Sequence, residues 1–331
     1  MGPMQETDTT NRDAGGPLPR QWTWCEQLER LVMNRVADWL EEDLGRECDW
    51  TSLATVASSA VATATVVTRG GGRVAGLPAA AVAAVRVDPQ LRFSTLVEDG
   101  TDVGRGEAVA EISGPVRSIL TAERTILNVL GRLSGVATAT ARLVALVGNG
   151  PSRVFDTRKT VPGWRLLDKY AVRMGGGWNH RTGLFDAILI KDNHLAALLA
   201  EAVDRPGGAS HGPGMAVRRA RDFVVRTFPP ARAGAMIIEV EVDSLDQLAD
   251  ALPAAPDVVL LDNMEPTNLV KAVAMRNAVA PAVVLEASGG VGPDTSASIA
   301  ASGVDRISSG WPTHHAPWLD LGLDWGGKST E

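Results

Sequence analysis

Six short apolar runs alternate with helical patterns between residues 150 and 310, and this alternation constrains the fold more than any other feature. The runs lie in SRVFDTR, FDAILIKDN, AMIIEVEV, DVVLLDN, AVVLEASGG and VDRISSG. Parallel strands need long crossover connections, which helices usually provide, so the alternation predicts a parallel sheet covered by helices. The pattern by itself fits either an open doubly wound sheet or an α/β barrel.

Polar residues follow nearly every run, at the point where the strand should end. They are Arg158, Lys191, Glu241, Asp262, Ser288–Gly290, Ser309 and Gly310. In α/β barrels the catalytic groups lie at the C-terminal ends of several strands, whereas an open sheet gathers its ligand at one switch point. The spread of polar ends therefore favours the barrel, although polar loops would also follow buried strands.

The overall charge limits what the chain can bind. Lysine and arginine number 32 against 39 acidic residues, a net charge of −7, which argues against a general nucleic-acid or membrane-surface binder. No apolar run reads as long enough to span a bilayer. Two cysteines are too few for a disulfide framework, so the sequence predicts a cytoplasmic protein. Because the chain is acidic overall, any anionic ligand must meet a local basic cluster.

Such a basic cluster follows two of the predicted strands: Arg158, Lys159, His180, Arg181 and Lys191. Arginine matches a carboxylate with two parallel hydrogen bonds, and lysine meets phosphate as a point charge. Converging cations repel each other unless an anion lies among them, so we expect a ligand rich in carboxylates, phosphates or both. Plain solvent exposure is the other explanation, but it fits poorly with residues placed beside such apolar strands.

Two carboxylates, Glu241 and Asp262, end consecutive strands and should be neighbours. Beside a phosphate site they would hold Mg²⁺ together with water, or bind ribose hydroxyls. Glu239 faces the same way, nearer the start of its strand, and would support the site or pair with a lysine. The glycine-rich turns at Ser288–Gly290 and Ser309–Gly310 can present backbone N–H groups to a phosphate.

Seven stretches between residues 40 and 325 form a distinctive set. They are EDLG…CDWTS, TAERTILNVLGRLSGVATAT, DTRKTVPGWRLLDKYAVRMGGGWNHRTGLFDAILIKDNH, EVEVDSL, VLLDNM, LEASGG and GLDW. In this order they resemble the quinolinate phosphoribosyltransferase family, also called nicotinate-nucleotide pyrophosphorylase (carboxylating). The long central stretch is the most specific part of the resemblance.

The resemblance implies two domains: an N-terminal α/β sandwich over residues 22–133, to which residues 311–331 return, and an open α/β barrel of six or seven parallel strands over residues 134–310. Residues 1–21 are expected to be a disordered tail. The implied reaction converts quinolinate and phosphoribosyl pyrophosphate (PRPP) to nicotinate mononucleotide, pyrophosphate and CO2, with Mg²⁺ as the cofactor. The implied assembly is a homodimer whose subunits complete each other's active sites, with no nucleic-acid or membrane partner.

The resemblance also assigns roles to the matching residues. Quinolinate would be bound by Arg158, His180, Arg181 and, from the other subunit, Arg124. Four residues would be catalytic. Lys159 and Lys191 would act on phosphate and pyrophosphate, and Glu241 and Asp262 would bind Mg²⁺ and the ribose hydroxyls. The 5′-phosphate would be held by Ser288, Gly289, Gly290, Ser309 and Gly310.

Six residues depart from the family pattern. Trp50 and Trp178 stand where smaller residues are common, and bulk is added directly after Gly310 by Trp311, Pro312, His315 and Trp318. They leave room for a relative with the same chemistry on another heteroaromatic carboxylate. A second alternative is an idle relative that only binds nucleotides or anions, and the intact set of charged residues speaks against it. The sequence therefore predicts quinolinate phosphoribosyl transfer in de novo NAD biosynthesis.

Overall fold

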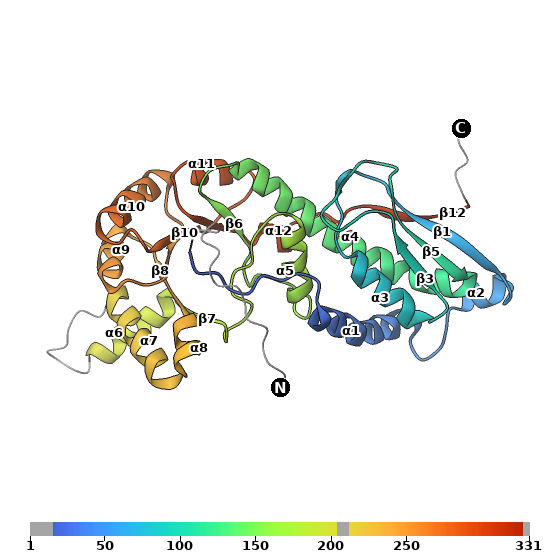
Figure 1. Cartoon of the computed structure of the whole chain (residues 1–331), viewed down its shortest axis with the longest axis horizontal. Coiled ribbons are helices and arrows are strands. Elements are labelled where there is room, and N and C mark those ends of the chain that lie inside the picture. The colour runs from blue at the N-terminus through green and yellow to red at the C-terminus, as the bar shows by residue number, and fades with distance from the viewer. Residues whose placement is uncertain (1–15, 204–211, 327–331) are drawn as a thin grey trace. The chain divides into compact units, whose positions relative to one another are not determined.

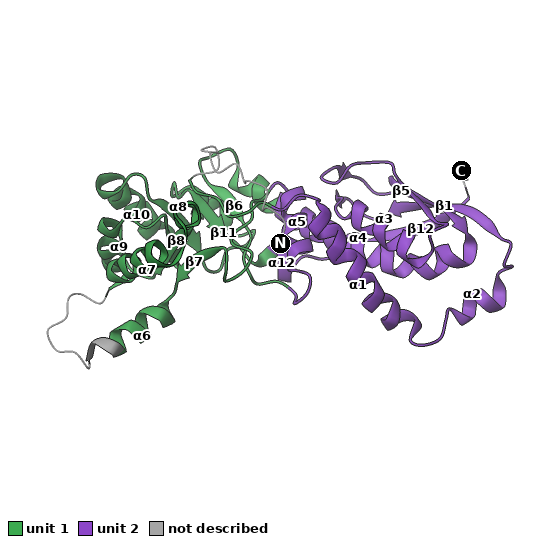
Figure 2. Ribbon diagram, turned by 60° about the horizontal axis from the view of Figure 1, so that its bottom comes forward, with its two compact units in different colours: residues 1–21, 142–160, 177–311 green, residues 22–141, 161–176, 312–331 purple. Residues whose placement is uncertain are grey.

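The structure, a computed structural model, describes residues 16–203 and 212–326 (Figure 1). The chain divides into two compact units (Figure 2). Unit 1 takes residues 1–21, 142–160 and 177–311, and unit 2 takes residues 22–141, 161–176 and 312–331. Each unit therefore draws on several separate stretches of the sequence.

Unit 1 is built on six parallel strands: β6 (Arg153–Phe155), β7 (Ala187–Ile190), β8 (Ile237–Val242), β9 (Val258–Asp262), β10 (Val284–Ser288) and β11 (Arg306–Ser308). Their order is β6-β11-β10-β9-β8-β7. From β7 to β11 each strand lies beside its successor in the chain, and β6 joins the far side of β11. This cyclic order is that of a barrel left open between β6 and β7, so the predicted open α/β barrel is confirmed.

Helices fill the connections and cover the outer face of the strands. They are α6 (Asp192–Val203), α7 (Pro213–Thr227), α8 (Pro230–Ala235), α9 (Leu245–Ala251) with the short 3₁₀ turn η2 (Leu252–Ala254), α10 (Pro266–Val279) and α11 (Ser296–Ala300). Buried residues of the strands, such as Val240, Val259 and Leu285, share one apolar core with Val217 of α7 and Leu269 of α10. The strands are nearly all apolar on this side because both faces of a parallel sheet are covered.

The other face of the strands lines the inside of the barrel, because successive side chains alternate between the two faces. At the strand starts an apolar cluster is formed by Ala187, Ile237, Val258 and Val284. Two residues further along come Glu239, Leu260 and Glu286, and two further still Glu241, Asp262 and Ser288. A charged layer therefore separates the apolar base from the strand ends that carry the predicted site.

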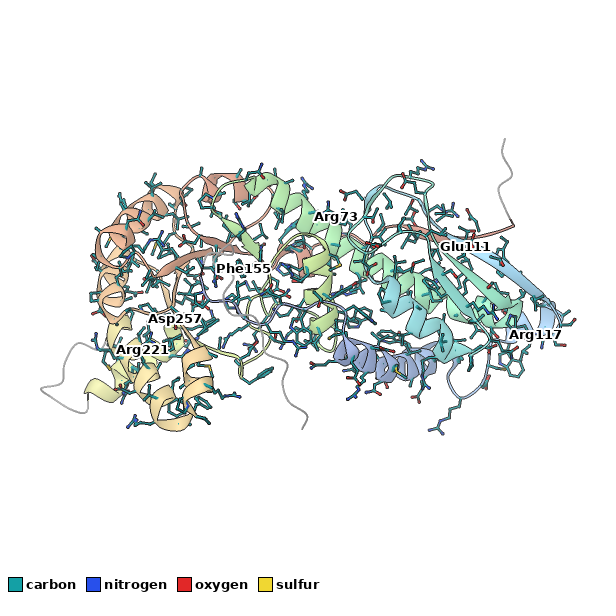
Figure 3. The ribbon with its side chains drawn as sticks, viewed as in Figure 1. Arg73, Glu111, Arg117, Phe155, Arg221 and Asp257 are labelled. Carbon is teal, nitrogen blue, oxygen red and sulfur yellow. The ribbon has the colours of Figure 1, made fainter. Side chains whose placement is uncertain are left out.

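Carboxylates that precede two strands tie the base of the barrel together. Asp257, just before β9, accepts a hydrogen bond from the backbone N–H of Ile238 at 2.8 Å, and Arg221 of α7 lies beside it (Figure 3). Asp305, just before β11, accepts one from Leu285 N–H at 2.7 Å and pairs with Arg276 at 2.7 Å. Each aspartate thus links a strand, its neighbour and a covering helix.

Unit 2 holds a four-stranded antiparallel sheet and a smaller two-stranded one. The large sheet has the order β12-β1-β5-β3, with β12 (Leu321–Trp325), β1 (Val61–Thr68), β5 (Ala108–Pro115) and β3 (Arg92–Thr95), and the small one joins β2 (Gly72–Arg73) to β4 (Asp102–Val103). The helices are α1 (Glu26–Leu44), α2 (Trp50–Thr55), α3 (Leu77–Val87), α4 (Val116–Val147), which belongs to unit 1 from Arg142 onward, and α5 (Arg165–Met174). The short α12 (Trp311–His314) connects the units in sequence. Leu28 of α1, Ala80 of α3, Leu130 of α4 and Leu167 of α5 share one core with the large sheet.

Two features of unit 2 differ from what the sequence pattern suggests. Ser134 and Gly135 look like a helix break, yet α4 runs through them. Ser134 Oγ exchanges hydrogen bonds with the backbone of Ala75, and a Cβ at Gly135 would come within 2.3 Å of Pro317 O. Small residues serve close packing here. The amphipathic α5, which looks like a barrel-covering helix, packs in the core of unit 2 instead.

The segment before α1 also differs from the sequence expectation. Residues 1–15 of the predicted disordered tail lie outside the described residues, but residues 16–21 have a defined place on unit 1. Arg306 Nη2 donates to Pro17 O at 2.6 Å. Gln21 exchanges two hydrogen bonds with the backbone of Asn179, at 2.8 and 3.0 Å. The expectation of disorder is therefore wrong for residues 16–21.

By length and composition alone, α4 could cross a membrane, which corrects the expectation that no run is long enough. Its most apolar stretch is 61% buried inside the protein. Core helices meet the same criteria, so a single helix of this kind is weak evidence for a membrane span. The absence of a membrane partner stays a prediction.

Candidate active site

One end of the barrel carries most of the predicted site residues, because all six strands are parallel and their C-terminal ends meet there. β8 and β9 end near Glu241 and at Asp262, and β10 ends at Ser288. Strand ends are followed by Arg158 and Lys159, by Lys191, by Gly289 and Gly290, and by Ser309 and Gly310. Asp262 and Ser288 are direct register partners on neighbouring strands.

A glutamate on β8 pairs with the lysine that directly follows β7. Lys191 Nζ forms an ion pair with Glu241 Oε2. The Glu241 side chain is 11% exposed, whereas that of Lys191 is 44% exposed. His194 Nδ1 accepts a hydrogen bond from Lys191 N–H at 2.8 Å and thereby fixes the turn that leads into α6. The lysine therefore reaches solvent at the barrel end while its partner carboxylate stays inside.

Two guanidinium groups lie close enough to affect one another. Burial, and then the charge of Arg158, hold the pKa of Arg181 below its usual value. Arg181 Nη1 donates to Ala187 O at 3.2 Å, but the Nε atoms of Arg158 and Arg181 are buried and have no hydrogen-bond partner among the described residues. Buried donors normally find acceptors. Two repelling cations with unused donors are the arrangement that an anionic ligand would complete.

Asp156 holds the segment that carries His180 and Arg181 against β6. Asp156 is buried and accepts hydrogen bonds from His180 N–H at 2.7 Å and from Asn179 Nδ2 at 2.8 Å. Trp178 makes a parallel bridge with Phe155, donating to Val154 O at 2.8 Å. The segment therefore lines the free edge of β6, and an aspartate one residue beyond the strand fixes its course.

The turn after β10 has a backbone that only glycine tolerates well. Gly289 has φ of +91°, and a Cβ there would lie 2.1 Å from Asn263 Oδ1. Asn263 N–H donates to Ser288 O at 2.9 Å, so the ends of β9 and β10 interlock. On the neighbouring strand end, Ser309 N–H donates to Phe155 O at 2.9 Å and Ser309 Oγ to Val291 O at 2.8 Å. These bonds fix two adjacent turns.

Comparison with known proteins identifies the arrangement. Residues 136–324 match the family Quinolinate phosphoribosyl transferase, C-terminal domain, and residues 49–134 match Quinolinate phosphoribosyl transferase, N-terminal domain. The chain belongs to the quinolinate phosphoribosyltransferase family.

The similarity to two curated relatives and one solved structure extends over nearly the whole length of each. The nicotinate-nucleotide pyrophosphorylase [carboxylating] of Mycobacterium leprae is 41% identical over 287 residues, which are 86% of this chain and 94% of the relative. A probable nicotinate-nucleotide pyrophosphorylase [carboxylating] of Synechocystis is 36% identical, with 86% and 89% covered. The solved nicotinate-nucleotide pyrophosphorylase of Francisella tularensis superimposes with a TM-score of 0.80 at 37% identity, covering 93% of this chain and 99% of that one.

Three charged residues inside this phosphoribosyltransferase barrel are almost fully buried. Glu239, Glu286 and Arg306 are 2%, 0% and 2% exposed. The guanidinium of Arg306 lies 4.7 Å from the ring centre of Phe155, which Figure 3 labels. Burial raises the pKa of Glu286 above its usual value. Sequence reasoning noted Glu239 but missed Glu286 and Arg306, although a charge inside an apolar strand is the signal for both.

The remaining predicted residues are placed differently in this family member. Arg124 lies exposed on α4 within unit 2, and its role in a neighbouring subunit stays a prediction. Trp178 packs on Phe155 with ring centres 6.4 Å apart, and Trp311 N–H donates to Ser309 Oγ at 3.1 Å. Trp50 is 63% exposed, and His315 contacts His314.

Proposed function

We propose that this chain is a quinolinate phosphoribosyltransferase that makes nicotinate mononucleotide, pyrophosphate and CO2 from quinolinate and PRPP, for de novo NAD biosynthesis. The observation that carries the proposal is the pair formed by the half-buried Arg158 and the buried Arg181, whose Nε donors are buried and unused among the described residues, at the strand ends of a barrel of this family. Quinolinate brings two carboxylates on adjacent ring atoms. A dianion of this shape can satisfy both guanidinium groups with paired hydrogen bonds.

The phosphate groups of PRPP fit the other strand ends. Lys159 and Lys191 offer ammonium groups for phosphate and pyrophosphate. The interlocked turns at Ser288–Gly290 and Ser309–Gly310 present backbone at neighbouring strand ends, where barrels often bind a phosphate. The 5′-phosphate would lie there, and the pyrophosphate beside the lysines.

Glu241 and Asp262 have the donor chemistry for Mg²⁺. Both offer carboxylate oxygens at adjacent strand ends, Asp262 is partly exposed, and Glu241 pairs with Lys191 through one of its two oxygens. Mg²⁺ is usually bound by one or two carboxylates together with water and substrate phosphates. When bound, it would neutralise charge on the pyrophosphate.

The chemistry uses these residues in two steps. The quinolinate nitrogen attacks ribose C1, and the bond from C1 to the pyrophosphate oxygen breaks. The ring nitrogen becomes cationic and stabilises the electron pair that stays at C2 when the adjacent carboxylate departs as CO2. That electron pair then takes up a proton. Lys159 and Lys191 stabilise the departing pyrophosphate, while Arg158 and Arg181 hold the ring so that its nitrogen faces C1.

We also propose that the enzyme works in the cytoplasm as a homodimer with shared sites. Both cysteines are free, as suits a reducing compartment. Arg124 is exposed on α4 and would reach the partner's site. Co-expression of an Arg124→Ala chain with an Arg158→Ala chain tests this, because a mixed dimer regains one intact site. Heterodimers that form without regaining activity would refute the shared site.

The decisive test compares quinolinate with nicotinate, which lacks the second carboxylate. A site built to bond a substrate group can reject the analogue without it by ~10⁴-fold or more. We expect release of CO2 and pyrophosphate with quinolinate, PRPP and Mg²⁺, and little turnover of nicotinate. Comparable kcat/KM for both acids would refute the proposal. Preference for another heteroaromatic acid would support a relative of changed specificity, and no turnover of any acid would support an idle binding protein.

A further inference from the structure

Ser309 directly follows β11, and both of its hydrogen-bond donors are used within the protein. Its backbone N–H donates to Phe155 O at 2.9 Å, and its hydroxyl donates to Val291 O at 2.8 Å. The hydroxyl oxygen also accepts a hydrogen bond from Trp311 N–H at 3.1 Å. A serine offers one backbone donor and one hydroxyl donor. Ser309, which is 2% exposed, therefore has no donor left over for a phosphate oxygen.

The hydroxyl of Ser309 reaches the neighbouring turn, between β10 and α11. Thr295, at the other end of this turn, donates through Oγ1 to Gly290 O at 3.0 Å, and the same atom accepts from Gly292 N–H at 3.0 Å. Val291, between these two glycines, takes the bond from Ser309. The turn is thus held from within by Thr295 and from the neighbouring strand end by Ser309.

The donors that remain in this turn belong to Gly289 and Gly290. Their φ values are +91° and +60°, and their backbone N–H groups have no hydrogen-bond partner among residues 16–203 and 212–326. Successive backbone N–H groups in a turn form a concavity that binds anions. The course of the turn decides whether both N–H groups can point at one phosphate.

Trp311, one of the departures from the family pattern, packs against the same turn. A Cβ at Gly292 would lie 3.8 Å from Trp311 Cδ1, and the Arg142 guanidinium lies 6.0 Å from the ring centre of Trp311. The ring is partly buried against the apolar core of unit 1, which includes Val291. It supports the turn through packing, while the backbone of the same residue donates to Ser309.

We propose that Ser309 is a positioning residue, which holds the turn of Gly289 and Gly290 through Val291 and leaves the phosphate to these two glycines. Trp311 supports this hold from the core side. That the phosphate is the 5′-phosphate of PRPP rests on the proposed function, whereas the hold on the turn does not.

The barrel offers a matched control at its opposite end. Ser152 precedes β6, is 2% exposed like Ser309, and donates through Oγ to Val304 O at 2.6 Å. Ser152→Ala and Ser309→Ala therefore remove the same kind of buried bond, from a serine hydroxyl to a backbone carbonyl. Only Ser309→Ala releases a turn at the predicted phosphate site.

Amide hydrogen exchange of the free protein tests the hold on the turn directly. The reporter is Gly292 N–H, which Thr295 protects in the wild type. We expect Ser309→Ala to speed its exchange by about 3- to 10-fold, and Ser152→Ala to leave it unchanged. Saturating ribose 5-phosphate should slow the exchange in Ser309→Ala again, because a bound phosphate draws the turn together.

Kinetics with PRPP and quinolinate show what the hold does for the enzyme. Ser309→Ala should raise the KM for PRPP by ~10-fold, with kcat and the KM for quinolinate within about 2-fold of the wild type. Ser152→Ala should change none of these. Trp311→Leu keeps the backbone bond to Ser309 but loses the ring, so it should raise the KM for PRPP and leave the preference for quinolinate over nicotinate unchanged.

A raised KM for PRPP in Ser309→Ala with wild-type exchange at Gly292 would overturn the proposal, because the hydroxyl would then bind the phosphate itself. An unchanged KM would also overturn it, as would an equal rise in Ser152→Ala, which would reflect a general loss of stability. Should the wild type fail to turn over quinolinate, the proposed function falls, while exchange in the free protein still decides whether Ser309 holds the turn.

Discussion

At the scale of single residues, Arg158 and Lys191 should respond differently to removal although both serve the site. Arg158 repels Arg181, whereas Lys191 neutralises a largely buried Glu241. We expect Arg158→Ala and Lys191→Ala each to cost about 2–5 kcal/mol of transition-state stabilisation, because each leaves a substrate charge unpaired. Only Lys191→Ala should lower the melting temperature.

The measurements are kcat/KM for quinolinate and thermal unfolding of the free proteins. Arg181→Ala serves as the matched control for Arg158→Ala, since removing either cation relieves the same repulsion. A large drop in the melting temperature of Arg158→Ala would show that this residue is needed for folding and not only for the site.

Tyr170 and Asp99 provide a prediction with a pH dependence. Burial raises the pKa of Asp99, and hydrogen bonds from Tyr170 OH and from Gly76 and Leu77 N–H oppose this effect. With a folded-state pKa above the unfolded value, ionisation of Asp99 costs stability as pH rises through that range. Tyr170→Phe removes support for the ionised form, so its cost of about 1–3 kcal/mol should be larger at neutral pH than in acid.

Urea unfolding of wild type and Tyr170→Phe over a pH series measures this difference in the free energy of unfolding. The two curves should approach each other as pH falls and Asp99 becomes protonated in both. A gap that stays constant with pH would mean that the hydroxyl contributes only through packing or through other partners.

The sequence predicts site residues well where a polar side chain directly follows an apolar strand. Lys191, Asp262 and Ser309 were identifiable in this way, since parallel strands gather their ends at one place. Asn179 and Gln21 were not, because they act through backbone hydrogen bonds between segments 158 residues apart in sequence. No local pattern marks such a partner. Arg306 was missed for a related reason, as its counter-charges come from other strands.

At the scale of elements, the turn between β10 and α11 offers a matched pair of glycines. Gly289 and Gly290 both have positive φ, +91° and +60°, but only at Gly289 would an added Cβ meet another side chain. Gly290→Ala should cost about 1–2 kcal/mol for the left-handed backbone alone. Gly289→Ala should cost about 1–3 kcal/mol more, because its methyl group must displace Asn263.

Thermal unfolding and the KM for PRPP are the two readouts. Displacing Asn263 disturbs the joint between the ends of β9 and β10, so Gly289→Ala should raise the KM for PRPP more than Gly290→Ala does. Equal effects of the two substitutions would mean that the turn adapts and that the contact with Asn263 is unimportant.

Elements themselves were predictable to different degrees. The six strands of unit 1 follow from apolar runs, and their helices follow from spacing. The position of α5 could not be predicted, because an amphipathic pattern does not indicate which sheet the helix will cover. Leu167 and Tyr170 of this helix pack in the core of unit 2. The continuity of α4 was hidden by Ser134 and Gly135, residues that mark a break in one context and close packing in another.

At the scale of the whole molecule, residues 16–21 form part of unit 1 although they precede unit 2 in the chain. They accept the hydrogen bond of the buried Arg306 and hold Asn179, next to the segment that carries Arg181. We therefore expect a chain that starts at residue 22 to be less stable than one that starts at residue 16. The lost hydrogen bonds, one of them to a charged group, contribute about 2–4 kcal/mol to the free energy of unfolding. The shorter chain should also have a lower kcat/KM, because the segment that carries Arg181 loses support.

Comparing these two truncated proteins isolates residues 16–21, since both lack residues 1–15. Unfolding temperature and quinolinate kinetics are measured on each. Gln21→Ala in the longer protein should reproduce part of the loss. Identical behaviour of the two truncated proteins would show that the barrel closes its base without this segment.

The strand orders have a consequence for how the polypeptide is made. β1 pairs with β12, whose first residue Leu321 lies 253 positions after its partner Thr68, and β6 pairs with β11, 153 positions later. At about 5–20 residues per second, β1 leaves the ribosome ~10–50 s before the strand that covers its edge. Unit 1 lacks its partner for β6 until β11 is made, and unit 2 lacks its partner for β1 until all of unit 1 has been synthesised. The nascent protein therefore carries two unpaired strand edges for most of its synthesis, and the cell must shield both from other chains.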